Sequence, residues 1–401
     1  MVDEIKKSLL AAVWFMFLTF PIMVVRVNTV EDVIEWRWAN MAIVGVGAFF
    51  LSMLWRYMLQ RKEAGKARAE RGEEASLPLL QRLLRDRRFT APALSVAVVF
   101  ALTFPHLFST YQVNIMISAF IYVMLGLGLN IVVGLAGLLD LGYVAFYAVG
   151  AYSYALLNHH FGIGFWIALP IGGVLGTIFG ILLGFPVLRL RGDYLAIVTL
   201  GFGEIIRLVL ENWNEFSFGP SGIAGIDRPG FFGVDMSIAQ VSVYIYYLMI
   251  GLMVFTIFVI NRLQNSRIGR AWIALREDEI ACQAMGIDKT TTKLRAFALG
   301  ATWAGMGGVV FAAKTTFINP ASFTFLESAI ILSVVVLGGM GSIVGVITGA
   351  FIVILLPEYL RAFSEYRMII FASMLVLMMV FRPQGLISNV RRTYEFHETE
   401  S

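Results

Sequence analysis

Long apolar runs separated by short polar stretches dominate the pattern of this chain. A helix that spans a bilayer needs about 20 mainly apolar residues, and many windows meet that length. The alternating pattern of a membrane barrel is absent, and lipid accommodates only helices or closed barrels. We therefore predict an all-α, polytopic membrane helical bundle of about ten to twelve spans. The expected spans are residues 8–27, 39–58, 91–110, 112–133, 137–158, 163–188, 194–211, 241–260, 294–313, 327–340, 343–360 and 367–381.

Composition agrees with a chain that lies in lipid. Hydrophobic residues make up 58% of the 401 residues and charged residues 14%, against about 25% charged residues in soluble domains, and the mean hydropathy is +0.78. The first apolar run has the length of a signal peptide, but it lacks a small-residue cleavage site and further spans follow, so we expect it to be retained. The single cysteine, Cys282, excludes an intrachain disulfide.

Lysine and arginine gather in two polar segments, and short basic loops stay on the cytoplasmic side of a membrane. Residues 60–90 hold nine of these side chains and residues 262–295 hold seven. The segment 212–240, rich in Gly, Pro and Phe, holds only Arg228. We expect the two basic segments and both termini in the cytoplasm, and 212–240 outside. The basic residues that give the net charge of +4 are therefore scattered over loop ends, and this distribution indicates no nucleic-acid partner.

A boundary between two membrane units is predicted near residue 89. The segment 61–88 mixes both charge signs with Gly72 and Pro78, as solvated linkers do. We expect a two-span N-terminal extension with its cytoplasmic linker over 1–89, the functional bundle over 90–390, and a cytoplasmic tail over 391–401.

Glycine gathers inside the apolar runs of the predicted bundle. Small residues let membrane helices approach closely, and this packing accounts for most of them. Two clusters, at 134–142 and 338–345, also fit the broken helices of transporters, whose half-helix ends receive polar solutes. The pathway candidates are Asp140, Gly137, Gly142, Gly338, Gly339 and Gly341.

Ionisable residues inside the expected spans are informative, because each costs at least about 2–3 kcal/mol if it is unpaired near the centre of the bilayer. They include Asp140, Glu204, Arg207, Glu211 and Glu327. Glu204 and Arg207 stand three apart on one helix, which predicts a structural ion pair. Asp140 has no such neighbour, so it is either a pathway residue or a hydrogen-bond acceptor at a helix end. Glu327 lies near the start of a span, where an acidic side chain favours the helix N-terminus.

Motifs of soluble enzymes are absent from the sequence. There is no GxxxxGK[ST] phosphate loop, no HExxH and no GxSxG. The adjacent His159 and His160 are more typical of an interfacial loop than of a set of metal ligands. We expect no catalytic residue, no cofactor and no metal, so the energy for uphill transport must come from an ion or from a partner.

The most informative stretch is the polar island at 262–293, which separates two apolar runs and must project into water. Residues 271–287, AWIALREDEIACQAMGI, predict one short amphipathic helix that ends near Gly286. Its apolar contacts would be Trp272, Ile273, Ile280, Met285 and Ile287, and its charged face Arg276, Glu277, Asp278 and Glu279. We expect these charges to lack internal partners, so we predict that the helix docks on another protein.

Several ordered motifs resemble one family. They include SRIGRAWIALREDEIACQAMGI at 266–287, KLRAFALGATWAGMGG at 293–308, GLAGLLDLGYVAFYAVGAY at 134–152 and RPQGL at 382–386. These residues resemble the branched-chain amino acid permeases of ATP-binding cassette importers, the LivM type. The resemblance covers about residues 110–390, and the first 90 residues resemble the two-span extension that some members carry.

The resemblance implies a heterodimer of two permeases in a bacterial inner membrane, with two cytoplasmic ATPase subunits. A periplasmic binding protein would deliver leucine, isoleucine or valine. The loop 262–293 would then dock an ATPase through Arg276, Glu277, Asp278, Glu279 and Gly286. The loop around Phe218, Pro220, Phe231 and Phe232 would be a seat for the binding protein or an outer lid.

Two departures and two alternatives accompany the resemblance. Many relatives have Ser-Leu-Gly where this chain has Asp140, Leu141 and Gly142, so a substrate role for Asp140 is not inherited. The general docking motif of importers, EAA followed by three residues and then Gly, is loose here, with Glu279, Ala281 and Gly286 at altered spacing. An ion-coupled secondary amino acid transporter would show functional acidic residues in its core, and a membrane enzyme would show convergent catalytic residues, which the sequence lacks.

Overall fold

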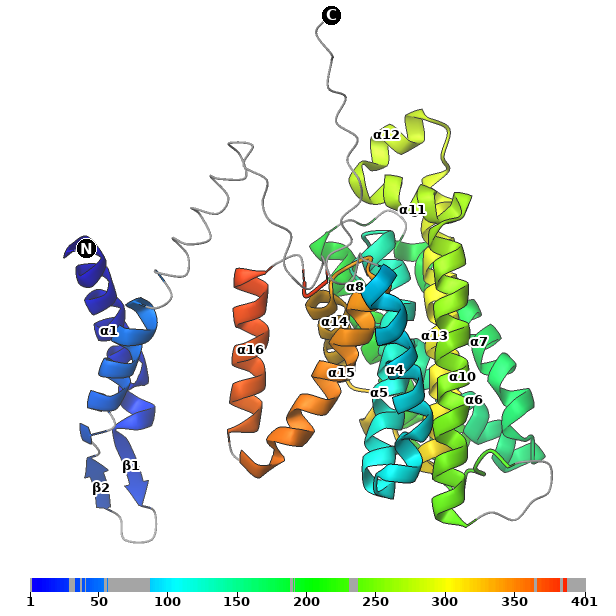
Figure 1. The fold of residues 1–401 in the computed structure, drawn as a ribbon, viewed down its shortest axis with the longest axis horizontal. Coiled ribbons are helices and arrows are strands. Elements are labelled where there is room, and N and C mark those ends of the chain that lie inside the picture. Colours follow the sequence, from blue (N-terminus) through cyan, green and yellow to red (C-terminus); the bar gives the residue numbers. More distant parts are fainter. Residues whose placement is uncertain are drawn as a thin grey trace, which may run out of the picture. The chain divides into compact units, whose positions relative to one another are not determined.

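A computed structural model describes residues 2–28, 33–36, 38–39, 41–53, 56, 87–187, 190, 192–230, 237–363, 366–382 and 385–387. The chain forms two compact units that divide between Asp86 and Arg87. Almost all regular structure in the described residues is helical, in agreement with the predicted fold class (Figure 1).

The first unit contains a helix, a short hairpin and a second apolar helix. Helix α1 spans Val2–Met23, and strands β1 (Val25–Asn28) and β2 (Val33–Trp36) pair antiparallel. An apolar helix follows over Met41–Met53. The predicted span 8–27 is therefore wrong at its end, because the β-branched residues after Met23 extend as a strand.

The second unit is a bundle of long helices. Its first half contains α4 (Arg87–Leu107), α5 (Thr110–Leu129), the π-helix η1 (Asn130–Leu135), α6 (Val144–Phe161), α7 (Phe165–Val187) and α8 (Asp193–Asn212). Its second half contains α10 (Ile238–Gln264), α11 (Arg267–Glu277), α12 (Glu279–Ala284), α13 (Lys289–Thr315), α14 (Phe325–Gly338), α15 (Ile343–Tyr359), η4 (Leu360–Phe363) and α16 (Arg367–Phe381).

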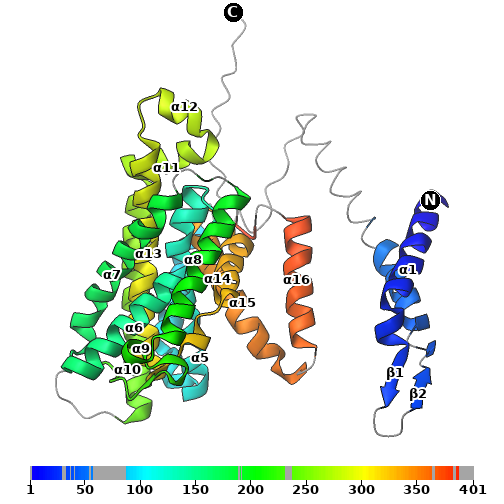
Figure 2. The ribbon, with the colours of Figure 1, turned by 180° about the vertical axis from the view of Figure 1, so that it is seen from behind.

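Short elements link α8 to α10 and α13 to α14. They are α9 (Asn214–Ser217), η2 (Gly219–Ser221), β3 (Ile223–Ala224), β4 (Phe317–Ile318) and η3 (Pro320–Ser322). Strands β3 and β4 pair antiparallel, with Ile223 opposite Ile318. These connections lie at one end of the bundle, and α11 and α12 protrude at the other (Figures 1 and 2).

Helices α5 and α13 form the centre of the bundle. Helix α13 packs against α7, α6 and α5, and α5 also packs against α10 and α15. Glycine makes the closest of these contacts possible: a Cβ atom on Gly150 of α6 would lie 2.0 Å from the carbonyl oxygen of Gly305 on α13. Packing therefore accounts for glycines at this crossing, as small residues do in membrane proteins generally.

Five helical segments among the described residues are long and apolar enough to cross a membrane. They are Thr110–Leu135, Phe165–Val187, Ala239–Gln264, Lys289–Thr315 and Pro320–Gly338. Shorter apolar helices occur at Met41–Met53, Val98–Leu107 and Ile343–Tyr359. A multi-pass chain follows, but the count of ten to twelve spans stays a prediction.

Candidate functional site

The polar island forms two helices, so the prediction of one continuous helix is wrong. Helix α11 ends at Asp278, whose backbone is extended, and α12 begins there. The reason is local: the carboxylate of Asp278 accepts hydrogen bonds from the amides of Ile280 (2.7 Å) and Ala281 (3.0 Å), which makes it the N-cap of α12. Gly286, which follows α12, has a φ of +82° and suits the predicted helix end.

A second cap fixes the start of α13. The Asp288 carboxylate accepts hydrogen bonds from the Thr291 hydroxyl and from the amides of Thr290 and Thr291. These bonds, led by that from the hydroxyl, hold the pKa of Asp288 below its usual value. Asp288 is therefore ionised at neutral pH and keeps the end of the loop in place.

The expectation that the charged face lacks internal partners is wrong for three of its four residues, since Asp278 caps α12 and both Arg276 and Glu279 contact the bundle. The Arg276 guanidinium donates a hydrogen bond of 2.6 Å to the carbonyl oxygen of Gly134 in η1. Glu279 forms an ion pair of 2.7 Å with the buried Lys293 of α13. Both side chains hold the loop against the bundle. Glu277 is exposed, as is Asp278 with its capping carboxylate.

The apolar residues of the loop also divide differently from the prediction. Trp272 is buried and its indole donates a hydrogen bond of 2.9 Å to the carbonyl oxygen of Thr292. In contrast, Ile280 is 71% exposed and Met285 is 82% exposed. Two large apolar side chains therefore point away from the chain at the tip of α12, where a partner protein would cover them.

A cleft of about 310 Å³ lies beside α11 and α12. Its lining comes from the turn after η1, from the start of α8 and from α11 and α12, and it comprises Ala136, Gly137, Leu138, Leu190, Gly192, Leu195 and residues 275–280. Gly137 lines this cleft, and the aliphatic part of the Arg276 side chain packs directly over it. A Cβ atom on Gly137 would lie 2.7 Å from Cγ of Arg276.

The two glycine clusters meet at this end of the bundle. The side-chain oxygen of Asn130 accepts a hydrogen bond of 2.8 Å from the amide of Gly341. A Cβ atom on Gly134 would lie 2.6 Å from the nitrogen of Gly341, so only glycine allows this approach. Gln264, at the end of α10, donates a hydrogen bond of 3.3 Å to the carbonyl oxygen of Gly341. The loop that carries α11 and α12, η1 and the α14–α15 turn are thus connected.

The remaining glycine candidates form the turn between α14 and α15. Gly338 ends α14, and a Cβ atom on it would lie 2.3 Å from the carbonyl oxygen of Gly345. Gly339 has a φ of +120°, which side-chain-bearing residues rarely adopt. The described part of the RPQGL motif closes over this turn, because the Leu386 amide donates to the Leu337 carbonyl at 2.9 Å.

Asp140 is fully buried in the turn between η1 and α6. One carboxylate oxygen accepts a hydrogen bond of 2.9 Å from the Gly142 amide, and the other has no hydrogen-bond partner. Gly142 packs on α8, where a Cβ atom would lie 2.0 Å from the carbonyl oxygen of Thr199. Asp140 therefore holds a close contact between the turn and α8, and its role in the pathway stays a prediction.

An ion-pair network runs along α8. Arg207 forms the predicted pair with Glu204 at 2.8 Å and also pairs with Glu211 at 2.7 Å. Neighbouring Ile205 and Leu208 on the same helix are exposed. Because Arg207 lies between two carboxylates, the three charges partly neutralise one another. This pairing lowers the free-energy cost of placing charged side chains on a membrane helix.

The opposite end of the bundle is held by aromatic and polar contacts. The ring centroid of Phe218 lies 5.1 Å from that of His159 and 6.5 Å from that of His160. The Asn158 amide donates a hydrogen bond of 2.9 Å to the Asp227 carboxylate, which ties the connection to α6. Phe231 and Phe232 lie outside the described residues.

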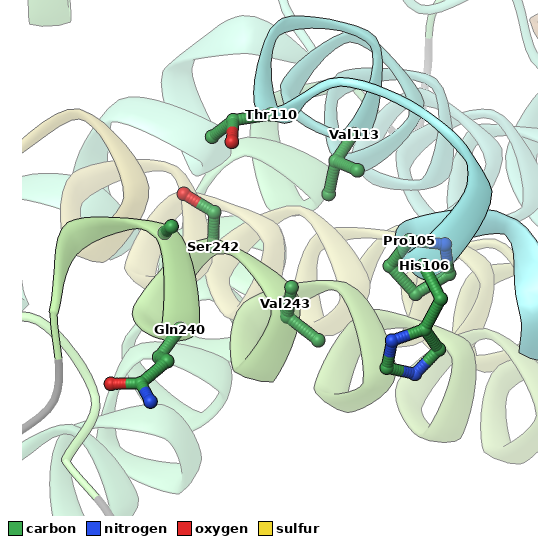
Figure 3. A pocket seen from close by; sticks show the side chains of 8 residues that line it. Pro105, His106, Thr110, Val113, Gln240, Ser242 and Val243 are labelled. Atoms are coloured by element: carbon green, nitrogen blue, oxygen red, sulfur yellow. The ribbon is translucent and has the colours of Figure 1, made fainter.

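A second hollow at this end lies between α4, α5 and α10 and measures about 360 Å³ (Figure 3). Its lining residues are Pro105, His106, Thr110, Val113, Ala239, Gln240, Ser242 and Val243. The His106 ring nitrogen Nε2 lies 3.1 Å from the Tyr247 hydroxyl. Across the described ranges, no group of three or more His, Cys, Asp or Glu residues could hold a metal ion.

Comparison with known proteins decides the family. The family described as "Branched-chain amino acid transport system / permease component" matches residues 111–379. This chain belongs to that family. The predicted resemblance is confirmed.

Curated relatives of this permease match over most of its length. The high-affinity branched-chain amino acid transport system permease protein LivM of Salmonella typhimurium is 44% identical over 385 residues, which cover 91% of this chain and 88% of the relative. LivM of Escherichia coli is 42% identical over 417 residues, covering 97% and 96%. The corresponding permease protein LivH of Escherichia coli is 22% identical over 285 residues, covering 66% and 91%. No solved structure matches the chain.

Some residues of this permease were missed by sequence reasoning. Lys314 lies one residue beyond the predicted span 294–313, but α13 continues to Thr315 and includes it. Asn130 is not ionisable, so it is absent from the charged residues predicted to be informative inside spans. The signal for Asn130 was present, since it is a polar residue in an apolar run beside a glycine cluster.

Proposed function

We propose that this permease forms half of the translocation pathway of an ATP-driven importer for branched-chain amino acids in a bacterial inner membrane. The observation that carries the proposal is the 44% identity to a LivM permease over 91% of the chain. A second permease related to LivH would complete the pathway, in keeping with the weaker similarity to LivH. Two ATPase subunits and a periplasmic amino-acid-binding protein would complete the importer.

The ATPase would dock at the α11–α12 loop. The exposed Ile280 and Met285 at its tip fit a hydrophobic pocket, and Glu277 and Asp278 provide a charged rim. Basic residues in this loop favour the cytoplasmic side. Helix α10 runs from the Gly- and Phe-rich segment to the α11–α12 loop in 27 residues, about 40 Å of helix. This length supports the proposal that the two loops face opposite sides of the membrane.

The contacts of the loop suggest how a movement of the ATPase reaches the pathway. Arg276 connects α11 to Gly134, and Gly134 touches the α14–α15 turn at Gly341. A displacement of α11 therefore pulls on two helix junctions together. Glycine at these junctions leaves no side chains to interlock, which favours rocking of helices against each other.

Co-purification and reconstitution test the proposal. The tagged permease, expressed with its neighbouring transport subunits, should bring down a second permease and two ATPases. Proteoliposomes that hold the complex should take up leucine only with ATP and the binding protein. Leucine uptake by the permease alone, driven by an ion gradient, would show a secondary transporter instead.

The docking surface has its own test. We expect the double change Ile280→Asp and Met285→Asp to leave the permease folded, because both side chains are exposed, but to lower ATPase binding at least about tenfold. Pull-down of the ATPase measures this directly. Thr290→Ala, at an exposed site at the start of α13, is the control. Undiminished ATPase binding by the double variant would place the docking surface elsewhere.

A further inference from the structure

The first half of α5 carries a stripe of partly exposed polar residues. Asn114, Ser118 and Tyr122 are half-buried and stand four residues apart, so they form one stripe. The stripe ends abruptly, since every residue from Val123 to Leu135 is buried. The partly exposed stripe therefore ends at Tyr122.

Two residues of opposite charge reach this stripe from neighbouring helices. Lys314, in the last turn of α13, donates hydrogen bonds to the Asn114 carbonyl oxygen at 3.1 Å and to the Ser118 hydroxyl. Glu327, in the first turn of α14, accepts a hydrogen bond from the Tyr122 hydroxyl. Both charged side chains are half-buried.

Neither charge is neutralised by the other. In the described part of the chain, ion pairs form at Arg207, Lys293 and Arg361, and none involves Lys314 or Glu327. An ammonium has three protons to donate, and Lys314 uses two of them on neutral groups. Unpaired charges at the edge of a membrane bundle are costly and mark functional sites.

The location places this pair where a solute would enter. Helix α13 begins beside the docking helices and ends at Thr315, and its 27 residues span about 40 Å. Lys314 and the starts of α5 and α14 therefore lie at the end of the bundle opposite α12.

We propose that Lys314 and Glu327 form a recognition site for the zwitterionic head of a free amino acid at the outer entrance of the pathway. The ammonium of Lys314 binds the α-carboxylate, and the carboxylate of Glu327 binds the α-ammonium. The assignment rests on the proposed import function and specifies which chemical groups of the solute the permease reads.

Protection of a thiol tests the site on the assembled complex. Ser118→Cys, made with Cys282→Ser, places a thiol in the stripe for labelling by a small methanethiosulfonate. We expect leucine to slow labelling about tenfold at saturation. Isoamylamine lacks the carboxylate and 4-methylpentanoate lacks the ammonium, so neither should protect. A thiol that does not label, or that all three compounds protect equally, overturns the site.

Removal of the charges gives an independent measurement. Lys314→Gln and Glu327→Gln should each abolish protection by leucine and lower uptake at least about tenfold, while the loaded binding protein still stimulates ATP hydrolysis. The control is the pair Glu358→Gln and Arg361→Gln, which removes an ion pair beside Tyr111 after α15. Normal protection and uptake in the Lys314 and Glu327 variants would overturn the site. Absence of ATP-driven leucine uptake in the unmodified complex would instead reject the proposed import function.

Discussion

At the scale of single residues, burial decides which charges stabilise the chain and which serve an interface. Glu279 and Glu277 stand two residues apart in one polar loop. Glu279 pairs with Lys293, whose side chain is only 3% exposed, whereas Glu277 is exposed. Two glutamates of the same predicted surface therefore have different roles.

The first prediction concerns this difference. Glu279→Gln should lower the free energy of unfolding by about 3–5 kcal/mol, because it leaves the buried Lys293 ammonium without its counter-charge. Glu277→Gln, the matched control, should change it by less than about 0.5 kcal/mol. Thermal denaturation of the purified permease in detergent measures both. Equal midpoints for the two variants would mean that the Lys293 pair contributes nothing.

Asp140 carries a second prediction at this scale. We expect Asp140→Asn to assemble normally, because an amide oxygen can still accept the Gly142 hydrogen bond. The pathway proposal further predicts that uptake falls when the charge is removed. Leucine uptake per assembled complex is the measurement. Undiminished uptake would leave Asp140 with its packing role at α8 alone.

At the scale of elements, one side chain connects the docking helices to the bundle. The Arg276 stem packs over Gly137 and its guanidinium reaches Gly134. Arg270 lies on the same helix but bonds only locally, through a hydrogen bond of 3.0 Å to the Asn265 carbonyl oxygen. Helix α11 therefore offers a matched pair of arginines.

We expect Arg276→Met to keep the packing of the stem while it removes the hydrogen bond to η1. ATP hydrolysis should persist, and leucine transported per ATP should fall several-fold, because the movement of α11 no longer reaches the junction. Arg270→Met should preserve the ratio. Proteoliposomes report uptake and hydrolysis together. An unchanged ratio in the Arg276 variant would show that the force passes through another contact.

At the scale of the whole molecule, the division at Asp86 separates a small unit from the bundle. The contacts that connect the docking loop, the glycine junctions and the charged stripe all lie after that division. We propose that the first unit assists expression or assembly and takes no part in the transport steps.

Deletion of residues 1–86 tests this proposal. The amount of assembled complex should fall, while leucine uptake per assembled complex should stay within about twofold of the full chain. Quantitative blotting and uptake on the same membranes give both values. A truncated permease that assembles fully but transports nothing would show that the first unit belongs to the transport machinery.

The sequence by itself determined that the chain lies in lipid, the fold class, the family and the position of the polar loop at 262–293. Apolar runs of membrane length leave few alternatives to helices, because lipid cannot satisfy open backbone groups. A charged island between two such runs must lie in water. The i, i+3 spacing on α8 was likewise sufficient for the Glu204–Arg207 pair, since the partners lie within one turn of helix.

Only the tertiary structure decided which residues from distant segments meet. The pairs Arg276 with Gly134, Asn130 with Gly341, and Lys314 with Ser118 join segments 142, 211 and 196 residues apart. Residue type cannot reveal such partners, because any helix of the bundle could have supplied them. The same limit applies to half-buried Glu279 and exposed Ile280. Local periodicity defines the faces of a helix, whereas the packing of α13 against the loop decides which face is covered.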